Sequence, residues 1–170
     1  MRVPPVTAAF ALAALASMAI AAAPAGDDEK DDLDIARFAS GAFHAPELAV
    51  EAGFVATNEC VRDTQGGQGG TGYRYVNRDN IGSLHPGRPA AVLYATDKEG
   101  VRQLVAVEYI VVDPDNDPDT VTPPKLFGRT FDGPITNVDG LPVHYSLHVW
   151  LWKHNPSGLF APYNPSVTCP

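Results

Sequence analysis

Residues 101–112 read VRQLVAVEYIVV, and this stretch decides the fold class. Its apolar and β-branched residues favour a strand, in which alternate side chains point to opposite faces. One face would hold Leu104, Ala106, Glu108 and Ile110. Residues 90–95 (AAVLYA) form a second compact apolar run, and residues 97–100 (DKEG) between the two runs are typical of a hairpin turn. The two runs therefore predict an antiparallel pair of strands.

Further elements are predicted on either side of this pair. Residues 72–77 (GYRYVN) and 144–152 (HYSLHVWLW) alternate like strands, whereas residues 60–72 end in QGGQGGTG and suggest a flexible loop. Residues 46–52 (PELAVEA) predict a short helix, because Pro46 suits a first turn and Gly53 suits the position after the last. Helices followed by strands indicate an α+β domain over residues 35–170, with short N-terminal helices packed on a twisted antiparallel sheet.

The N-terminal region has the pattern of an export signal. Arg2 is followed by an almost wholly apolar stretch that ends in small residues, so we expect residues 1–25 to be a cleaved signal peptide rather than a retained anchor. Residues 26–34 (GDDEKDDLD) are acidic and poor in apolar side chains, which suggests a flexible tail. The protein is therefore expected to be secreted, with no membrane contact after cleavage.

Composition narrows the classes of partner and supports export. The 170 residues include 12 Lys+Arg and 20 Asp+Glu, and the formal charge of −8 argues against binding to nucleic acid or to an anionic membrane. The two cysteines, Cys60 and Cys169, are an even number and lack the close spacing of a redox pair. We expect them to form one structural disulfide.

The last predicted strand is the most informative about function. Tyr145, Leu147, Val149 and Leu151 would face a core, and the opposite face would carry His144, Ser146, His148, Trp150 and Trp152. Residues four apart on a strand are separated by about 13 Å, so His144 and His148 do not easily share one metal ion. Either these side chains fill a second small core, or they form a ligand or metal site with His44 or His85.

A weaker metal site is suggested by residues 113–119 (DPDNDPD), in which Asp113, Asp115, Asp117 and Asp119 alternate. An EF-hand loop requires Gly at its sixth position and Glu at its twelfth, where this chain has Pro118 and Pro124. We therefore favour a rigid, solvated acidic loop over weak Ca²⁺ binding.

Several segments together resemble a known family. They are Phe43-His44 leading to residues 52–54 (AGF), residues 72–77, 104–109 and 124–134 (PKLFGRTFDGP), and the C-terminal HYSLHVWLWKHNPSGLFAPYNPSVTC over residues 144–169. The chain resembles a family of small secreted bacterial proteins of the actinobacterial type that has no established activity. The resemblance implies export and a histidine cluster to which His44, His144 and His148 correspond. Arg74 stands where that family more often has histidine, and an arginine would bind a carboxylate or phosphate in bidentate fashion.

The leading hypothesis is a non-enzymatic, exported binding protein for a metal or a small ligand. Its pocket would be lined by His44, Arg74, His144, His148, Trp150 and Trp152. A transition metal on the three histidines is one expected cofactor. A second hypothesis is a metal-assisted hydrolase or lyase with Glu108 as a nearby acid. A third is a cell-envelope interaction protein that presents Trp150 and Trp152 as an exposed patch.

Overall fold

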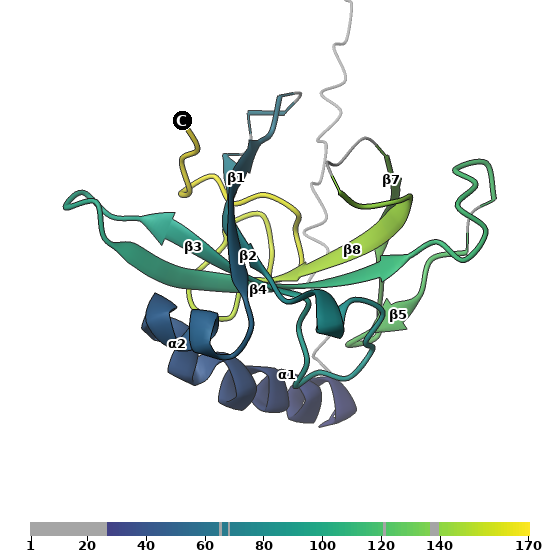
Figure 1. The fold of residues 1–170 in the computed structure, drawn as a ribbon, viewed down its shortest axis with the longest axis horizontal. Helices are drawn as coiled ribbons and strands as arrows, with labels where there is room; N and C mark the ends of the chain where they lie inside the picture. The colour runs from purple at the N-terminus through teal and green to yellow at the C-terminus, as the bar shows by residue number, and fades with distance from the viewer. Residues whose placement is uncertain (1–26, 65, 68, 121, 137–139) are drawn as a thin grey trace, which may run out of the picture.

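The computed structural model describes residues 27–64, 66–67, 69–120, 122–136 and 140–170 (Figure 1). The predicted signal peptide lies outside these residues. The chain begins with helix α1 (Asp27–Ser40), continues into the 3₁₀ turn η1 (Gly41–His44) and then forms the short helix α2 (Pro46–Glu51). No helix among the described residues has the length and apolar character needed to cross a membrane.

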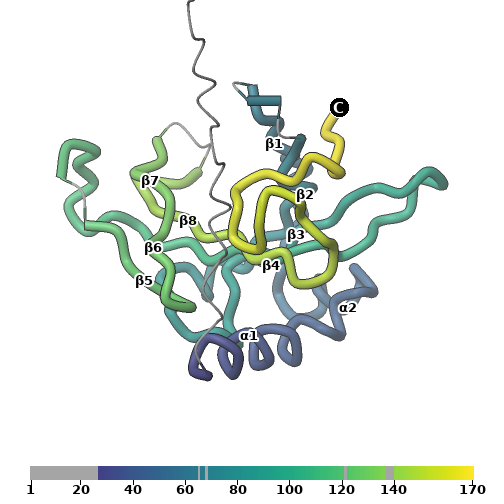
Figure 2. The backbone as a smooth tube through the Cα atoms, turned by 180° about the vertical axis from the view of Figure 1, so that it is seen from behind, coloured from purple at the N-terminus to yellow at the C-terminus, as the bar shows by residue number. Residues whose placement is uncertain are grey.

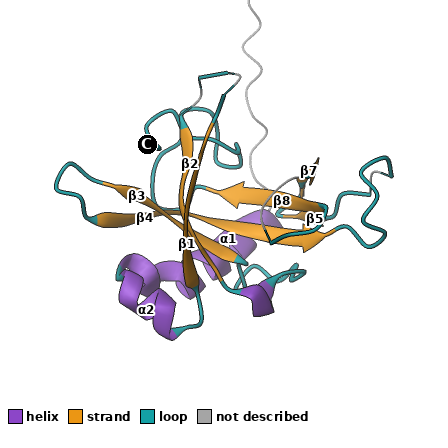
Figure 3. Cartoon of the chain, turned by 45° about the horizontal axis from the view of Figure 1, so that its top comes forward, coloured by secondary structure: helices purple, strands orange, loops and turns teal. Residues whose placement is uncertain are grey.

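A curled, six-stranded antiparallel sheet follows, with strands in the order β1-β2-β3-β4-β8-β7 (Figure 3). Its strands are β1 (Val55–Arg62), β2 (Gly70–Val76), β3 (Ala91–Thr96), β4 (Arg102–Val112), β7 (Asp132–Ile135) and β8 (His144–Val149). The 3₁₀ turn η2 (Arg78–Asn80) lies between β2 and β3, and β5 (Lys125–Leu126) pairs with β6 (Arg129–Thr130) in a separate ribbon. The predicted α+β class and antiparallel sheet are confirmed.

The acidic segment before residue 35 is helical, so the prediction of a flexible tail at residues 26–34 was wrong for residues 27–34. Leu33, Ala36 and Ser40 lie on one side of α1 and are buried. Asp27, Asp28 and Glu29 occupy the first turn, where negative charge is favourable next to the helix dipole. The helical part is thus dominated by one 14-residue helix rather than by several short ones.

The two faces of the sheet are covered by different parts of the chain. Leu33, Ala36 and Ala49 from the helices pack into a core with Val92, Tyr94, Tyr109, Tyr145, Leu147 and Val149. Figure 1 shows the helices beneath this face. On the other face, Val167 and Trp150 from the C-terminal segment pack against Leu93, Val105 and Ala106. In Figure 2 this segment crosses the back of the sheet.

A bulge in β4 changes the predicted division of its side chains. Leu93 pairs with Ala106 and Tyr94 pairs with Leu104, so Val105 has no partner of its own in the ladder. The extra residue places Leu104 in the core next to the helices, whereas Ala106 belongs to the cluster on the other face. The simple alternation predicted for residues 104–110 therefore fails at its N-terminal end.

The predicted disulfide joins Cys60 of β1 to Cys169, with an S–S distance of 2.02 Å. Two further contacts hold the same region together. The Arg62 guanidinium donates a hydrogen bond to the Cys169 carbonyl at 3.0 Å, and Gly70 pairs with Asn164 in an isolated bridge. The C-terminal segment is thereby fixed to β1 and β2.

Candidate functional site

Strand β8 supplies the first residues of the site. Tyr145, Leu147 and Val149 point into the core beside the helices, as the alternation predicted. His144, Ser146 and His148 occupy the positions between them and are also buried, with only 3–4% of their surface exposed. The face of β8 that points away from the helices is therefore an enclosed polar row.

Glu108 and Arg74 complete this row from the neighbouring strands. Glu108 is paired directly with His148 across β4 and β8, and also with Ala91 across β3 and β4. The small side chain of Ala91 leaves room for the Arg74 guanidinium to reach Glu108 from β2, two strands away. Arg74 Nε donates to Glu108 Oε2 at 2.7 Å and Nη2 donates to Oε1 at 3.0 Å, a bidentate contact.

Glu59 on the edge strand β1 gives Arg74 a second carboxylate. Arg74 Nη1 donates to Glu59 Oε2 at 3.3 Å. The Arg74 and Glu108 side chains are 11% and 2% exposed, whereas Glu59 is 37% exposed and so faces both the guanidinium and solvent. Arg74 was expected to bind a carboxylate or phosphate in bidentate fashion, and in the structure its bidentate partner is a carboxylate of the protein itself, that of Glu108.

Burial and these charges determine the protonation of the row. Burial by itself would raise the pKa of Glu108, but the charge of Arg74 and their hydrogen bonds outweigh it and leave that pKa lowered. The pKa of Arg74 is raised, chiefly by the charge of Glu108. The pKa of His148 is lowered from 6.5 because its burial outweighs the attraction of Glu108 and Asp132. Near neutral pH the row thus holds an ion pair next to an uncharged imidazole.

A cavity of about 820 Å³ opens over this row. It is lined by residues of β1, β2, β4, β7 and β8 and by the C-terminal segment: Asn58, Glu59, Cys60, Val61, Thr71, Arg74, Glu108, Asp132, Ile135, His144, Ser146, His148, Pro162 and Tyr163. This volume is in the range of sites that enclose a small organic molecule.

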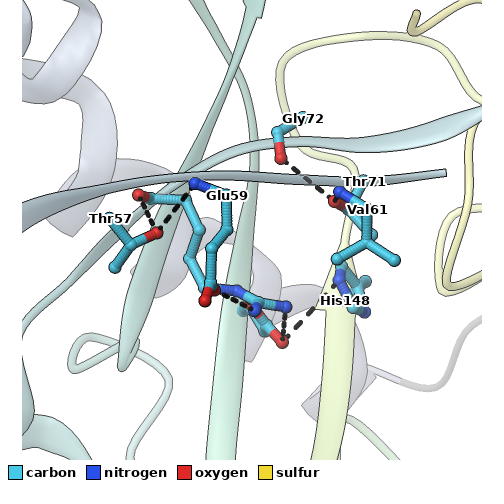
Figure 4. A network of polar contacts seen from close by, with 8 residues as sticks. Thr57, Glu59, Val61, Thr71, Gly72 and His148 are labelled. Atoms are coloured by element: carbon cyan, nitrogen blue, oxygen red, sulfur yellow. Dashed lines mark hydrogen bonds and ion pairs between the residues drawn. The ribbon is translucent and has the colours of Figure 1, made fainter. Parts of the chain in front are cut away.

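His148 is the unusual member of the lining. Its Nε2 lies 3.8 Å from Glu108 Oε1, beyond hydrogen-bond distance, and neither buried ring nitrogen has a hydrogen-bond partner. Figure 4 shows Glu59 and His148 on opposite sides of one network of polar contacts. A buried polar group left unsatisfied costs about 1–3 kcal/mol, so a group that hydrogen-bonds His148 would recover that free energy.

The lowered pKa of His148 predicts an acid-sensitive stability. The unfolded chain takes up a proton on this histidine near pH 6.5, and the folded chain does so only at lower pH. The stability that depends on a neutral His148 is therefore complete above pH 6.5 and is lost as the pH falls through the folded pKa. The neighbouring charged groups are Glu108, Arg74 and Asp132.

Urea denaturation at pH 7.5, 6.5 and 5.5 measures this effect. Between pH 6.5 and 5.5 the wild type should lose roughly 1 kcal/mol more unfolding free energy than His148→Leu. His154→Leu, which removes an exposed histidine, should behave like the wild type. Equal losses in the wild type and His148→Leu would show that His148 keeps its ordinary pKa in the folded protein.

The structure does not bring His44 to the other two histidines. His44 ends η1 on the helix-covered side of the sheet, where its ring packs against Trp152 with centroids 4.6 Å apart. His144 and His148 line the cavity on the other side. His85 is exposed and accepts a hydrogen bond from the Gly87 N–H. The predicted three-histidine set of His44, His144 and His148 is thus divided between the two faces of the sheet.

Neither tryptophan lines the cavity, which corrects the prediction of a pocket lined by Trp150 and Trp152. Strand β8 ends at Val149, and the Trp152 N–H instead donates to the Val105 carbonyl at the bulge of β4. The Trp152 indole donates to Ser40 Oγ of α1, on the helix side. Trp150 is 3% exposed within the cluster that contains Val167.

The acidic loop uses its carboxylates within its own turns. Asp113, Asp115 and Asp117 each accept a hydrogen bond from the N–H two residues later, at 2.9–3.2 Å. Asp113 also accepts from the Tyr145 hydroxyl, and Asp115 from that of Thr120. In the part of the chain that the structure describes, no cluster of three His, Cys, Asp or Glu side chains is arranged to hold a metal ion.

Glu59 and Asp132 were missed as site residues. Both lie on strands that the sequence analysis did not predict, β1 and β7. Asp132 interacts electrostatically with His148, and burial raises its pKa. The alternation of Val55, Thr57, Glu59 and Val61 was the available signal for β1, but most of this edge strand is exposed and it lacks a continuous apolar face.

Comparison of the chain with models of protein families, with curated proteins and with solved structures found no match.

Proposed function

We propose that this protein is an exported, non-enzymatic binding protein that holds one small polar molecule in the cavity over β4 and β8. The observation that supports this proposal most strongly concerns His148. It is a buried imidazole with two unpartnered nitrogens, and it lies in the wall of a cavity large enough for such a molecule. A neutral imidazole offers one donor and one acceptor. A ligand that hydrogen-bonds to one of them would be held at a fixed position in the cavity.

The rigidity of the surrounding row supports binding. Glu108 is held by two hydrogen bonds from Arg74, and the chain on both sides of His148 belongs to a central strand. A site built on strands with fixed side chains loses little conformational entropy when a ligand enters. His144 and Ser146 add polar groups on the same wall.

The two alternative functions have less support. A general acid works best when its pKa lies near the operating pH, whereas the pKa of Glu108 is lowered and its carboxylate is paired with Arg74. Trp150 is buried, so it does not contribute to an exposed aromatic patch for an envelope partner. A metal ion bound by His144 or His148 would be detected in the experiment below.

The test is to identify what leaves with the protein when it is purified from the host that secretes it. Native mass spectrometry should show a bound species of small mass, and denaturation should release it for identification. His148→Phe, which removes both nitrogens and fills part of the cavity, should lose this species. His154→Phe on the surface is the matched control and should retain it.

Two results would contradict the proposal. One is a wild-type protein with the mass of the bare chain and no change in the His148 ring signals upon addition of its culture medium. The other is a bound species that His148→Phe retains in full, since binding would then not involve this site.

A further inference from the structure

The charge of the cavity lining narrows the class of ligand. Three carboxylates (Glu59, Glu108 and Asp132) and one guanidinium (Arg74) line it. These four groups give the wall a formal charge of −2. Because charges in a partly enclosed cavity are screened less than charges in water, this wall favours a cation and repels an anion.

Arg74 does not reverse this preference. Three of its five N–H groups donate to Glu108 and Glu59, so its positive charge is matched within the protein. An anion would have to compete with two carboxylates for this guanidinium. Asp132 lies on the other side of His148 from this pair, contributed by β7, and no cationic side chain of the lining is paired with it.

His148 provides the second, independent indication. One of its unpartnered nitrogens is a hydrogen-bond acceptor, because the lowered pKa of His148 keeps the imidazole uncharged near neutral pH. An ammonium group supplies the N–H donor that this nitrogen needs. A small amine therefore meets this requirement.

On the basis of the proposed function, we infer that the ligand is a small organic cation. It is a protonated amine, bound to the acceptor nitrogen of His148 and placed between Asp132 and Glu59. The wall carboxylates attract the ammonium charge, and His148 fixes its orientation. A cation next to Asp132 also opposes the effect of burial on that carboxyl group, so binding should lower the pKa of Asp132.

Four probes of equal chain length separate charge from shape: 1,4-diaminobutane, 4-aminobutan-1-ol, butane-1,4-diol and succinate. Each is titrated into the mature protein at pH 7.5 while the ring signals of His148 are followed by NMR. We expect 4-aminobutan-1-ol to bind at least tenfold more tightly than butane-1,4-diol, and succinate to leave the signals unchanged. The diamine should also bind more tightly than the diol.

Two variants localise the charge effect. Asp132→Asn keeps the shape of the side chain and should weaken binding of 4-aminobutan-1-ol at least fivefold without changing the affinity for the diol. Glu51→Gln removes an exposed carboxylate from α2, on the other side of the sheet, and should leave both affinities unchanged. An equal effect of the two variants would indicate only the general charge of the protein and would overturn the inference.

The outcomes distinguish this inference from the proposed function. If the diol or succinate shifts the His148 signals as strongly as the amines, the cavity binds ligands but the preference for a cation is wrong. If no probe shifts the signals, the cation inference is overturned. If, in addition, the purified protein contains no small molecule, the proposed function fails as well.

Discussion

Replacement of Arg74 by alanine is expected to lower the free energy of unfolding by about 3–5 kcal/mol. The side chain of Glu108 is only 2% exposed, and Arg74 makes both of its short ionic contacts. Without Arg74, a buried carboxylate would remain opposite the uncharged His148. The loss arises mainly from this uncompensated charge rather than from the strength of the ion pair itself.

The unfolding free energy of Arg74→Ala should also depend on pH differently from that of the wild type. In the wild type the pKa of Glu108 is lowered, so its stabilising contribution is present above pH 4.5 and is lost as the pH falls through the folded pKa. Without Arg74, burial dominates and that pKa rises above 4.5. As the pH falls, protonation of Glu108 removes the uncompensated buried charge from Arg74→Ala. The difference in unfolding free energy between this variant and the wild type should therefore become smaller.

Urea denaturation at pH 7.5 and at pH 5 measures both effects. The control is the double variant Arg74→Met/Glu108→Leu, which replaces both charges by apolar side chains of similar size and should regain most of the lost stability. If Arg74→Ala lost less than about 1 kcal/mol of unfolding free energy, Glu108 would not be the uncompensated buried charge that we expect. Solvent would then already screen the charge of Glu108.

The elements that were predicted correctly are those in which one local pattern dominates. Strands β4 and β8 have long apolar alternations, and their central positions in the sheet bury both faces. The disulfide followed from two cysteines without an alternative partner. In each case the local preference and the tertiary structure favour the same conformation, which is the usual condition for a reliable prediction.

The structural predictions were wrong where tertiary contacts, rather than the local sequence, determine the conformation. At the bulge, the Val105 carbonyl accepts a hydrogen bond from the Trp152 N–H, and the Trp152 indole lies beside the helices. An alternating sequence pattern does not predict where such a bulge occurs. Residues 27–34 are highly charged, yet they are helical: Leu33 is buried, acidic residues occupy the first turn, and Glu29 forms an ion pair with Arg129. Propensity and composition do not determine such outcomes.

Some residues of the candidate site were therefore predicted from the sequence, and others were not. His144 and His148 were identified because two histidines on one face of a strand are unusual, and Arg74 because it departs from a resemblance. The partners Glu59 and Asp132 lie on the two edge strands, β1 and β7, and the pairing of these strands brings them to the cavity. These two carboxylates make the cavity lining acidic, and the inference of a cationic ligand depends on them.

Removal of the disulfide is the second change for which we expect a large effect. The Cys60–Cys169 bond joins residues 109 apart, and in the chain-entropy model such a crosslink stabilises the folded state by about 4–5 kcal/mol. Cys60→Ala/Cys169→Ala should lose most of this free energy in urea denaturation. Both single variants should lose the same amount, since either one abolishes the crosslink.

The disulfide should also matter for the cavity, because Cys60 belongs to its lining and adjoins Glu59. Strand β1 is an edge strand that pairs only with β2, and its ladder is interrupted on both sides of Cys60. Without the crosslink we expect the C-terminal half of β1 to exchange its amide hydrogens faster than β4. If the double variant instead lost less than 1 kcal/mol and kept its exchange pattern, the Arg62–Cys169 and Gly70–Asn164 contacts would suffice to hold the C-terminal segment.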